Sequence, residues 1–150
     1  MTGNTPSKSH PEYFGKDMPF ISPGDIQNSK ICSPNQGLSV EGVPFGRIVD
    51  ANSILQVCIG GSIGKAAVCD YTVAFNQQLN SLTPIMCNSR YLLSCLSSFY
   101  FVASMKEKAG GTATPIINKS TWESLLIPLP SLNEQQRIVE KLDCIFAKLK

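Results

Sequence analysis

The hydrophobic pattern of this 150-residue chain changes near Asn88, and that change restricts the folds open to it. Before Asn88, short apolar runs alternate with Gly, Pro, Asn and Ser, which is typical of short strands joined by loops. Strands are predicted at residues 18–22, 54–59, 66–69, 72–75 and 79–86. Pro19 and Pro84 indicate strand edges or strand ends, because proline cannot donate a hydrogen bond to a sheet.

After Asn88, apolar residues recur at intervals of three and four, which predicts one amphipathic helix. Its apolar stripe consists of Leu92, Leu93, Leu96, Phe99, Tyr100 and Ala103. Asn88 and Ser89 can cap its start, and Gly110 and Gly111 predict its end. Further extended segments are expected at residues 115–118 and 125–129, and Trp122 and Leu125 are expected in the core. Together these elements predict a mixed α/β (α+β) fold.

The C-terminal segment predicts a helix with a coiled-coil seam. Asn133 and Gln136 have the spacing of a capping box. The apolar residues after them are spaced four, three and four apart: Ile138, Leu142, Ile145 and Leu149. Such spacing indicates a seam between helices, although a terminal helix packed on its own domain has the same pattern. Because no cap follows Leu149, we expect the helix to continue as a spacer.

Several classes of function lack the residues that they need. The hydrophobic content of 43% allows one core. No two cysteines have the spacing of a metal-binding pair, so neither a metal nor a cofactor is expected: Cys32, Cys58, Cys69, Cys87, Cys95 and Cys144. His10 is the only histidine, and no Ser-His-Asp set or pair of carboxylates can be assembled from the sequence. We therefore expect a chain without catalytic activity.

Charge and targeting signals give less direct information. The net charge of +2 is too small to indicate nucleic-acid binding by itself. Residues 1–10 contain no apolar run, so no signal peptide is expected. The longest apolar stretch, residues 92–104, is far shorter than the roughly 20 residues of a membrane span. A cytoplasmic protein without a membrane partner is the expectation.

The segment from Gly60 to Lys65 superficially resembles a nucleotide-binding loop. A Walker A motif needs four residues between its glycines and a Ser or Thr after its lysine, whereas here three residues intervene and Ala66 follows. The plain alternative is a tight turn between the strands predicted at residues 54–59 and 66–69.

Three blocks of sequence resemble the specificity subunits of type I restriction-modification enzymes. The most specific is IPLPSLNEQQRIV at residues 127–139, which looks like the junction between a target recognition domain and a spacer helix in that family. The second block includes Gly3, Thr5-Pro6, Tyr13-Phe14-Gly15, Pro19-Phe20-Ile21 and Asp25-Ile26. The third includes Ile59-Gly60, Ser62 to Lys65 and Asn76-Gln77-Gln78. The resemblance therefore covers nearly the whole chain.

This resemblance implies a function that composition does not reveal. It implies a globular target recognition domain at residues 1–130 and the start of a spacer helix at residues 131–150. The domain would read one half of a bipartite target in double-stranded DNA. Its other partners would be the modification (methyltransferase) subunits, a second recognition domain or half-subunit joined through antiparallel helices, and, indirectly, the restriction subunit. Family members usually extend further at both ends, so the chain resembles half of a specificity subunit.

The resemblance also suggests which residues contact DNA. Small residues around Ser62 and Lys65 would let the backbone approach a phosphate. Glutamine suits bidentate contact with adenine, although Asn76, Gln77 and Gln78 could equally form a local hydrogen-bond network. The complete set of candidate DNA contacts is Lys8, Ser62, Lys65, Gln77, Gln78, Thr112 and Lys119. The alternative function is an assembly module that docks on modification subunits without reading DNA.

Overall fold

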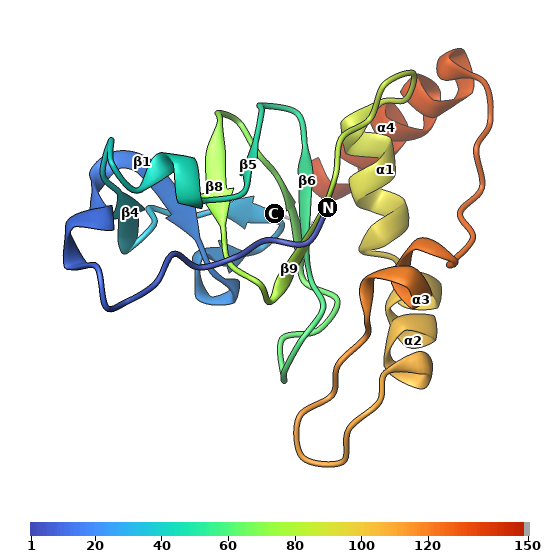
Figure 1. Cartoon of the computed structure of the whole chain (residues 1–150). Helices are drawn as coiled ribbons and strands as arrows, with labels where there is room; N and C mark the ends of the chain where they lie inside the picture. Colours follow the sequence, from blue (N-terminus) through green and yellow to red (C-terminus); the bar gives the residue numbers. More distant parts are fainter. Residues whose placement is uncertain (149–150) are drawn as a thin grey trace.

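In the computed structural model, which describes residues 1–148, short strands form one half of the chain and helices the other (Figure 1). A four-stranded sheet has the order β4 (Gln36–Leu38), β1 (Phe14–Ile21), β8 (Val73–Phe75), β5 (Ile48–Val49). A three-stranded sheet has the order β7 (Ala66–Val68), β6 (Ile54–Val57), β9 (Leu79–Leu82). The third sheet is a hairpin of β2 (Ile26–Gln27) and β3 (Lys30–Ile31).

Four α-helices follow the strands in the sequence: α1 (Ser89–Leu96), α2 (Phe99–Lys108), α3 (Lys119–Glu123) and α4 (Leu132–Ala147). In the described part of the chain, three single-turn 3-10 helices precede β1 or lie between strands, at Pro11–Tyr13, Pro23–Asp25 and Val43–Phe45. This arrangement confirms the mixed α/β fold that the change of pattern near Asn88 predicts. No helix within residues 1–148 is long and apolar enough to cross a membrane.

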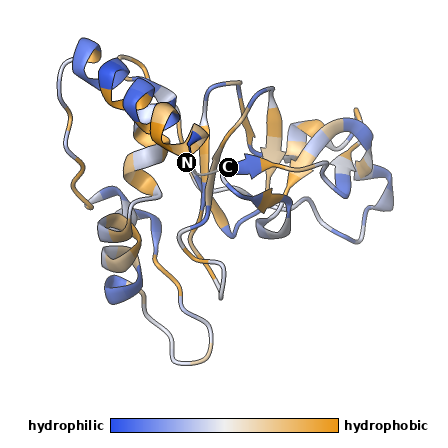
Figure 2. Ribbon diagram, turned by 180° about the vertical axis from the view of Figure 1, so that it is seen from behind, coloured by the Kyte–Doolittle hydropathy of each residue, from blue (hydrophilic) through white to orange (hydrophobic). Residues whose placement is uncertain are grey.

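Strand β6 separates two hydrophobic clusters because its side chains alternate between the two faces of the sheet. Leu55 and Val57 belong to a cluster with residues of the other strands, including Phe75. Ile54 belongs to a second cluster, which the helices cover, with Leu92 and other apolar residues. All four residues of β6 are buried, so the three-stranded sheet is covered on both faces (Figure 2).

The strand predictions are confirmed in position but not in every boundary. β1 begins at Phe14, four residues before the predicted strand, and β9 ends at Leu82. Pro84 therefore follows its strand, as predicted. Pro19 lies inside β1 and is paired with Gly37 of β4, while pairing with β8 begins only at the next residue. The prediction of an edge or end for Pro19 is thus wrong, because the missing donor falls where β8 is not yet paired.

The prediction of a single helix after Asn88 is wrong, because Ser97 and Ser98 divide it into α1 and α2. The Ser98 side chain accepts a hydrogen bond from the Phe101 backbone N–H at 3.2 Å and caps the new helix. On α2, Phe101 and Met105 are buried in the core. The predicted residues of this part, Phe99, Tyr100 and Ala103, are exposed, and Phe99 is 90% exposed. Leu92 and Leu96 on α1 are buried as predicted.

The segment between the two predicted extended regions contains α3, which the pattern did not predict. Asn118 caps this helix by accepting a hydrogen bond from the Thr121 N–H at 2.9 Å. Trp122 is buried and Leu125 packs against the same cluster, as expected. Only Ile116 of the predicted segment at 115–118 forms bridges, to Ile59 and Gly110.

Helix α4 begins two residues earlier than the predicted cap implies. The cap is Ser131, whose side chain accepts from the Glu134 N–H at 3.4 Å, and not Asn133. Ser131 has φ −57° and ψ 155°, a non-helical conformation that suits an N-cap residue. The prediction of an Asn133 cap is therefore wrong by two residues.

Candidate nucleic-acid interface

Three segments that are distant in the sequence meet at one end of the three-stranded sheet, where β6 ends and β9 begins. The Cys58 N–H donates to the Gln78 carbonyl at 2.8 Å, and the Ile117 N–H donates to the Cys58 carbonyl at 3.0 Å. The Gly60 N–H donates to the Pro115 carbonyl at 2.8 Å. We call the surface formed by residues 58–65, 76–78 and 109–118 the loop edge; it lies at the lower end of Figure 1.

Ser62 and Lys65 lie in the loop between β6 and β7, where a turn is formed by the hydrogen bond from the Ile63 N–H to the Gly60 carbonyl at 3.1 Å. Gly60 and Gly64 have φ values of +88° and +97°, which favour glycine. A Cβ at Gly64 would also lie 2.6 Å from Cγ1 of Val102. The Lys65 side chain is exposed and Ser62 is half-buried, so both can meet a ligand at the loop edge.

In the amide-rich turn between β8 and β9, two of the three side chains bond each other and the third is exposed. Asn76 is buried; its Oδ1 accepts from the Gln78 N–H at 3.0 Å and its Nδ2 donates to Gln78 Oε1 at 3.2 Å. Gln77 is exposed, and its Oε1 accepts from the Thr5 hydroxyl at 2.6 Å. Asn76 and Gln78 therefore build the turn, and Gln77 presents an amide to solvent.

The remaining candidate DNA contacts are spread more widely. Thr112 is exposed in the loop-edge segment 109–118. Lys119 directly follows that segment, where it forms an ion pair of 3.4 Å with Glu123. Lys8 is exposed on the N-terminal segment, outside the hydrogen bonds that join the loop edge. The structure thus brings five of the seven candidates to the loop edge, places Lys119 beside it and leaves Lys8 apart.

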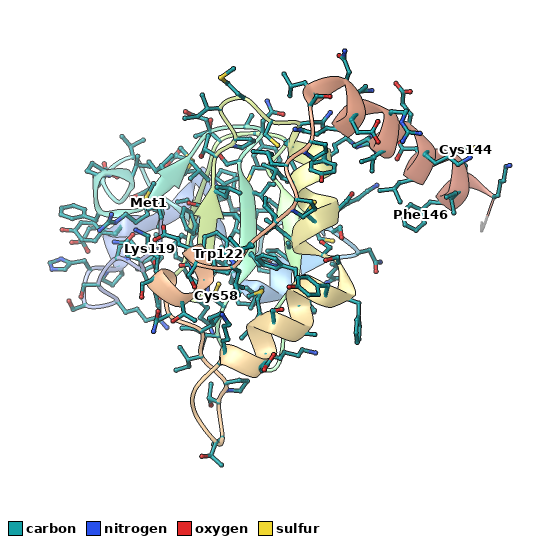
Figure 3. The ribbon with its side chains drawn as sticks, turned by 90° about the vertical axis from the view of Figure 1, so that its right-hand side faces the viewer. Met1, Cys58, Lys119, Trp122, Cys144 and Phe146 are labelled. Atoms are coloured by element: carbon teal, nitrogen blue, oxygen red, sulfur yellow. The ribbon has the colours of Figure 1, made fainter. Side chains whose placement is uncertain are left out.

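A buried glutamine that the sequence pattern did not reveal holds the loop edge in place. Gln56 is fully buried in β6, where its Nε2 donates to the carbonyls of Leu96 at 2.9 Å and Gly64 at 3.2 Å. Its Oε1 accepts from Trp122 Nε1 at 2.8 Å. Trp122 lies close to Cys58 in Figure 3. One side chain therefore joins the β6–β7 loop to α1 and α3. The only sequence signal is a polar residue within an apolar strand.

A second buried glutamine fixes the base of α4. Gln135 is 1% exposed; its Oε1 accepts from the Asn88 N–H at 2.9 Å and from the Cys87 thiol at 3.1 Å. Its Nε2 donates to the Pro130 carbonyl at 2.8 Å. An ion pair of 2.7 Å between Arg90 and Asp143 adds a contact further along the helix. The first half of α4 is therefore docked on α1 of the same chain.

The apolar stripe of α4 is partly buried near the start of the helix and exposed near its end. Ile138 and Leu142 are half-buried against the domain, and Val139 beside them is buried. Ile145 is 43% exposed and Phe146 is 58% exposed, near the end of α4 in Figure 3. Leu149, the last residue of the predicted seam, lies outside the described residues. The alternative of a terminal helix packed on its own domain therefore holds for the first half of α4, and a seam between helices in its second half stays a prediction.

Burial keeps several potentially reactive groups protonated. It raises the pKa of the Cys58 thiol from 9.0 to about 12, and the same cause raises the pKa of Cys69 to about 12. Desolvation likewise raises the pKa of Tyr91 to about 12; its hydroxyl donates to the Pro128 carbonyl at 3.0 Å. His10 bonds Glu12 on the surface at 2.8 Å. Within residues 1–148, no group of three His, Cys, Asp or Glu could hold a metal ion.

These thiol environments predict selective labelling. At pH 8 we expect the exposed Cys32 and Cys144 to react first with a maleimide or iodoacetamide. Cys58 and Cys69 should resist, because a pKa raised from 9.0 to about 12 lowers the thiolate fraction about a thousandfold. Peptide mass spectrometry checks the order, with protein in denaturant as the control in which all six react. Rapid labelling of Cys58 in the native chain would contradict the packing around β6.

Comparison with known proteins places these features in a family. The whole chain, residues 1–150, matches the sequence model of the type I restriction modification DNA specificity domain. It is 34% identical over 97% of its length to the type I restriction enzyme HindI specificity subunit of Haemophilus influenzae, of which it covers 33%. It is 31% identical over 94% of its length to the EcoR124I/EcoR124II specificity subunit of Escherichia coli, of which it covers 37%.

A solved structure shows the same fold. The HsdS subunit of Thermoanaerobacter tengcongensis superimposes with a TM-score of 0.74 at 22% identity, over 98% of this chain and 34% of that one. The chain spans about a third of the length of the curated relatives that it matches. Its sequence over all 150 residues shows that this chain belongs to the family of type I restriction modification DNA specificity domains.

Proposed function

We propose that this chain reads one half of a bipartite target in double-stranded DNA as part of a type I restriction-modification specificity subunit. The observation that carries the proposal is the loop edge, where backbone hydrogen bonds join the three segments that carry Ser62, Lys65, Gln77 and Thr112. Such a surface combines phosphate donors with an amide suited to a base edge. Membership of the DNA specificity domain family supports the same conclusion.

The proposal assigns different tasks to two parts of the chain. Residues 1–130 form the target recognition domain, and residues 131–150 begin a spacer helix. The exposed side of α4 around Ile145 would pair with the antiparallel helix of a second recognition domain or half-subunit. Modification subunits would dock on this assembly and carry out methylation, with the restriction subunit recruited indirectly. The chain itself would contribute position and sequence choice without catalysis, in the cytoplasm.

Two substitutions at the loop edge test DNA reading. Lys65→Ala should weaken binding to every duplex severalfold and reduce the salt dependence by about one phosphate contact. Gln77→Ala should weaken binding about tenfold to a duplex selected from a random library, yet leave a scrambled duplex unaffected. Fluorescence anisotropy at several salt concentrations measures both effects.

The matched control is Lys141→Ala, which removes an exposed lysine from α4, away from the loop edge. It should leave both affinities within about twofold of the unaltered chain. A chain that captures modification subunits but shows no salt-dependent affinity for duplex DNA would contradict the proposal. That result would support the alternative of an assembly module without DNA reading.

A further inference from the structure

The hairpin of β2 and β3 ends in a tight turn of two residues. Asn28 and Ser29 have φ values of 49° and 60°, as the central residues of a type I′ turn require. The strands pair Ile26 with Ile31 and Gln27 with Lys30. The right-handed twist of such a turn matches that of the strands, so the tip has one defined conformation.

The root of this hairpin is fixed in the core. Ile26 is 1% exposed and belongs to the cluster around β6, against which Ile31 also packs. The Cys32 N–H donates to the Asp25 carbonyl at 2.8 Å. The buried Asp25 carboxylate accepts hydrogen bonds from both the backbone N–H and the hydroxyl of Ser22. The hairpin is therefore a rigid ribbon and not a loose loop.

The tip of the hairpin is exposed and rich in unused hydrogen-bonding groups. Gln27, Asn28, Ser29 and Lys30 are all exposed. The Gln27 side chain makes one long hydrogen bond, of 3.4 Å, to the Gly24 carbonyl. Across the described part of the chain, the other three side chains form no hydrogen bond with the protein. The Asn28 amide, the Ser29 hydroxyl and the Lys30 ammonium can thus meet a ligand, and the Gln27 amide can do so by giving up one long hydrogen bond.

The hairpin forms one wall of a groove of about 640 Å³, and the β6–β7 loop forms another. Lys65, already assigned to a phosphate contact, lines this groove opposite Gln27 and Asn28. Ser97, which follows α1, and Val102 of α2 close the third side. No Asp or Glu lines the groove among the residues that the structure describes. A polyanion can therefore enter without meeting a carboxylate.

From this geometry we propose that the β2–β3 hairpin enters the major groove of the target DNA and that Gln27 and Asn28 read base edges there. The major groove admits a two-stranded ribbon, and both side chains carry the amide that pairs bidentately with adenine. Lys65 holds the adjacent phosphate. This inference rests on the proposed function and makes it specific: the hairpin, together with Gln77, determines which sequence is bound.

The test combines Gln27→Ala with Asn28→Gly, since glycine tolerates the positive φ of the turn. The control combines Asn35→Ala with Gln36→Ala, two exposed amides near β4 outside the groove. Each full-length chain is incubated at low salt with a random duplex library and the bound sequences are read. Affinities for the duplex selected by the unaltered chain and for a scrambled duplex are then measured. Circular dichroism confirms that each variant is folded.

We expect the hairpin variant to lose about tenfold or more in affinity for the selected duplex, to keep its affinity for the scrambled duplex, and to select a changed motif. The control should behave like the unaltered chain. An unchanged motif and affinity, or an equal loss on both duplexes, would overturn base reading by the hairpin while leaving the proposed function intact. No DNA affinity in the unaltered chain would instead overturn the proposed function, and this inference with it.

Discussion

Replacing Gln56 by leucine is expected to lower the free energy of unfolding by about 3 kcal/mol, although the side chains are similar in size. The substitution leaves the Trp122 N–H and the carbonyls of Gly64 and Leu96 without their partner in a buried site. Each unpaired buried group costs about 1 to 3 kcal/mol. For a domain of this size, the melting temperature should fall by roughly 6 to 12 °C.

The same substitution is expected to weaken DNA binding beyond its effect on the folded fraction. Gly64 lies next to Lys65, so the loss of its hydrogen bond to Gln56 frees the β6–β7 loop to move. Gln36→Leu is the control, because Gln36 is exposed on β4 and its loss should change stability by less than about 0.5 kcal/mol. Calorimetry and DNA titration measure the two effects. Equal stability of both variants would contradict the role of Gln56 as a buried connector.

Replacing Gln135 by alanine is expected to loosen α4 and to lower the free energy of unfolding by about 2 kcal/mol. The substitution removes the partner of the Asn88 N–H, the Cys87 thiol and the Pro130 carbonyl. Because α4 begins the proposed spacer helix, its altered direction should also reduce assembly with the second recognition domain. Hydrogen exchange at the Asn88 amide reports the loss of docking directly.

Gln136→Ala provides a control from the adjacent position. Gln136 is exposed and makes a surface hydrogen bond with the Asn88 side chain at 3.0 Å. Its removal should change stability by less than about 0.5 kcal/mol and leave exchange at the Asn88 amide slow. If both variants exchange alike, the docking of α4 depends on its apolar face around Val139 and not on Gln135.

The sequence alone determined the class of fold and the family. Alternation of apolar residues with turn residues predicts five of the strands, and spacing of three and four predicts the region of α1 and α2 and the helix α4, because both signals depend on neighbouring residues only. The hairpin of β2 and β3 was not predicted, because Asn28-Ser29 is not one of the dipeptides typical of two-residue hairpin turns. The distinctive junction at residues 127–139 identified the family.

Features that depend on distant contacts were not predictable in this way. The stripe from Leu92 to Ala103 fits one helix, yet a serine cap at Ser98 and the burial of Phe101 favour two. Burial of an isolated polar residue is likewise invisible locally. Gln56 bonds residues 8, 40 and 66 positions away, and Gln135 bonds residues 47 and 48 positions away.

The loop edge illustrates the same division. The sequence determined that Ser62, Lys65 and Gln77 occupy turns, because glycine and amide residues have strong local preferences. Only the tertiary structure decided that these turns lie together with residues 109–118, and that Gln77, not Gln78, faces solvent. The reason is physical: a turn depends on the conformations of a few neighbouring residues, whereas a shared surface depends on which strands pair and which polar groups find partners across the core.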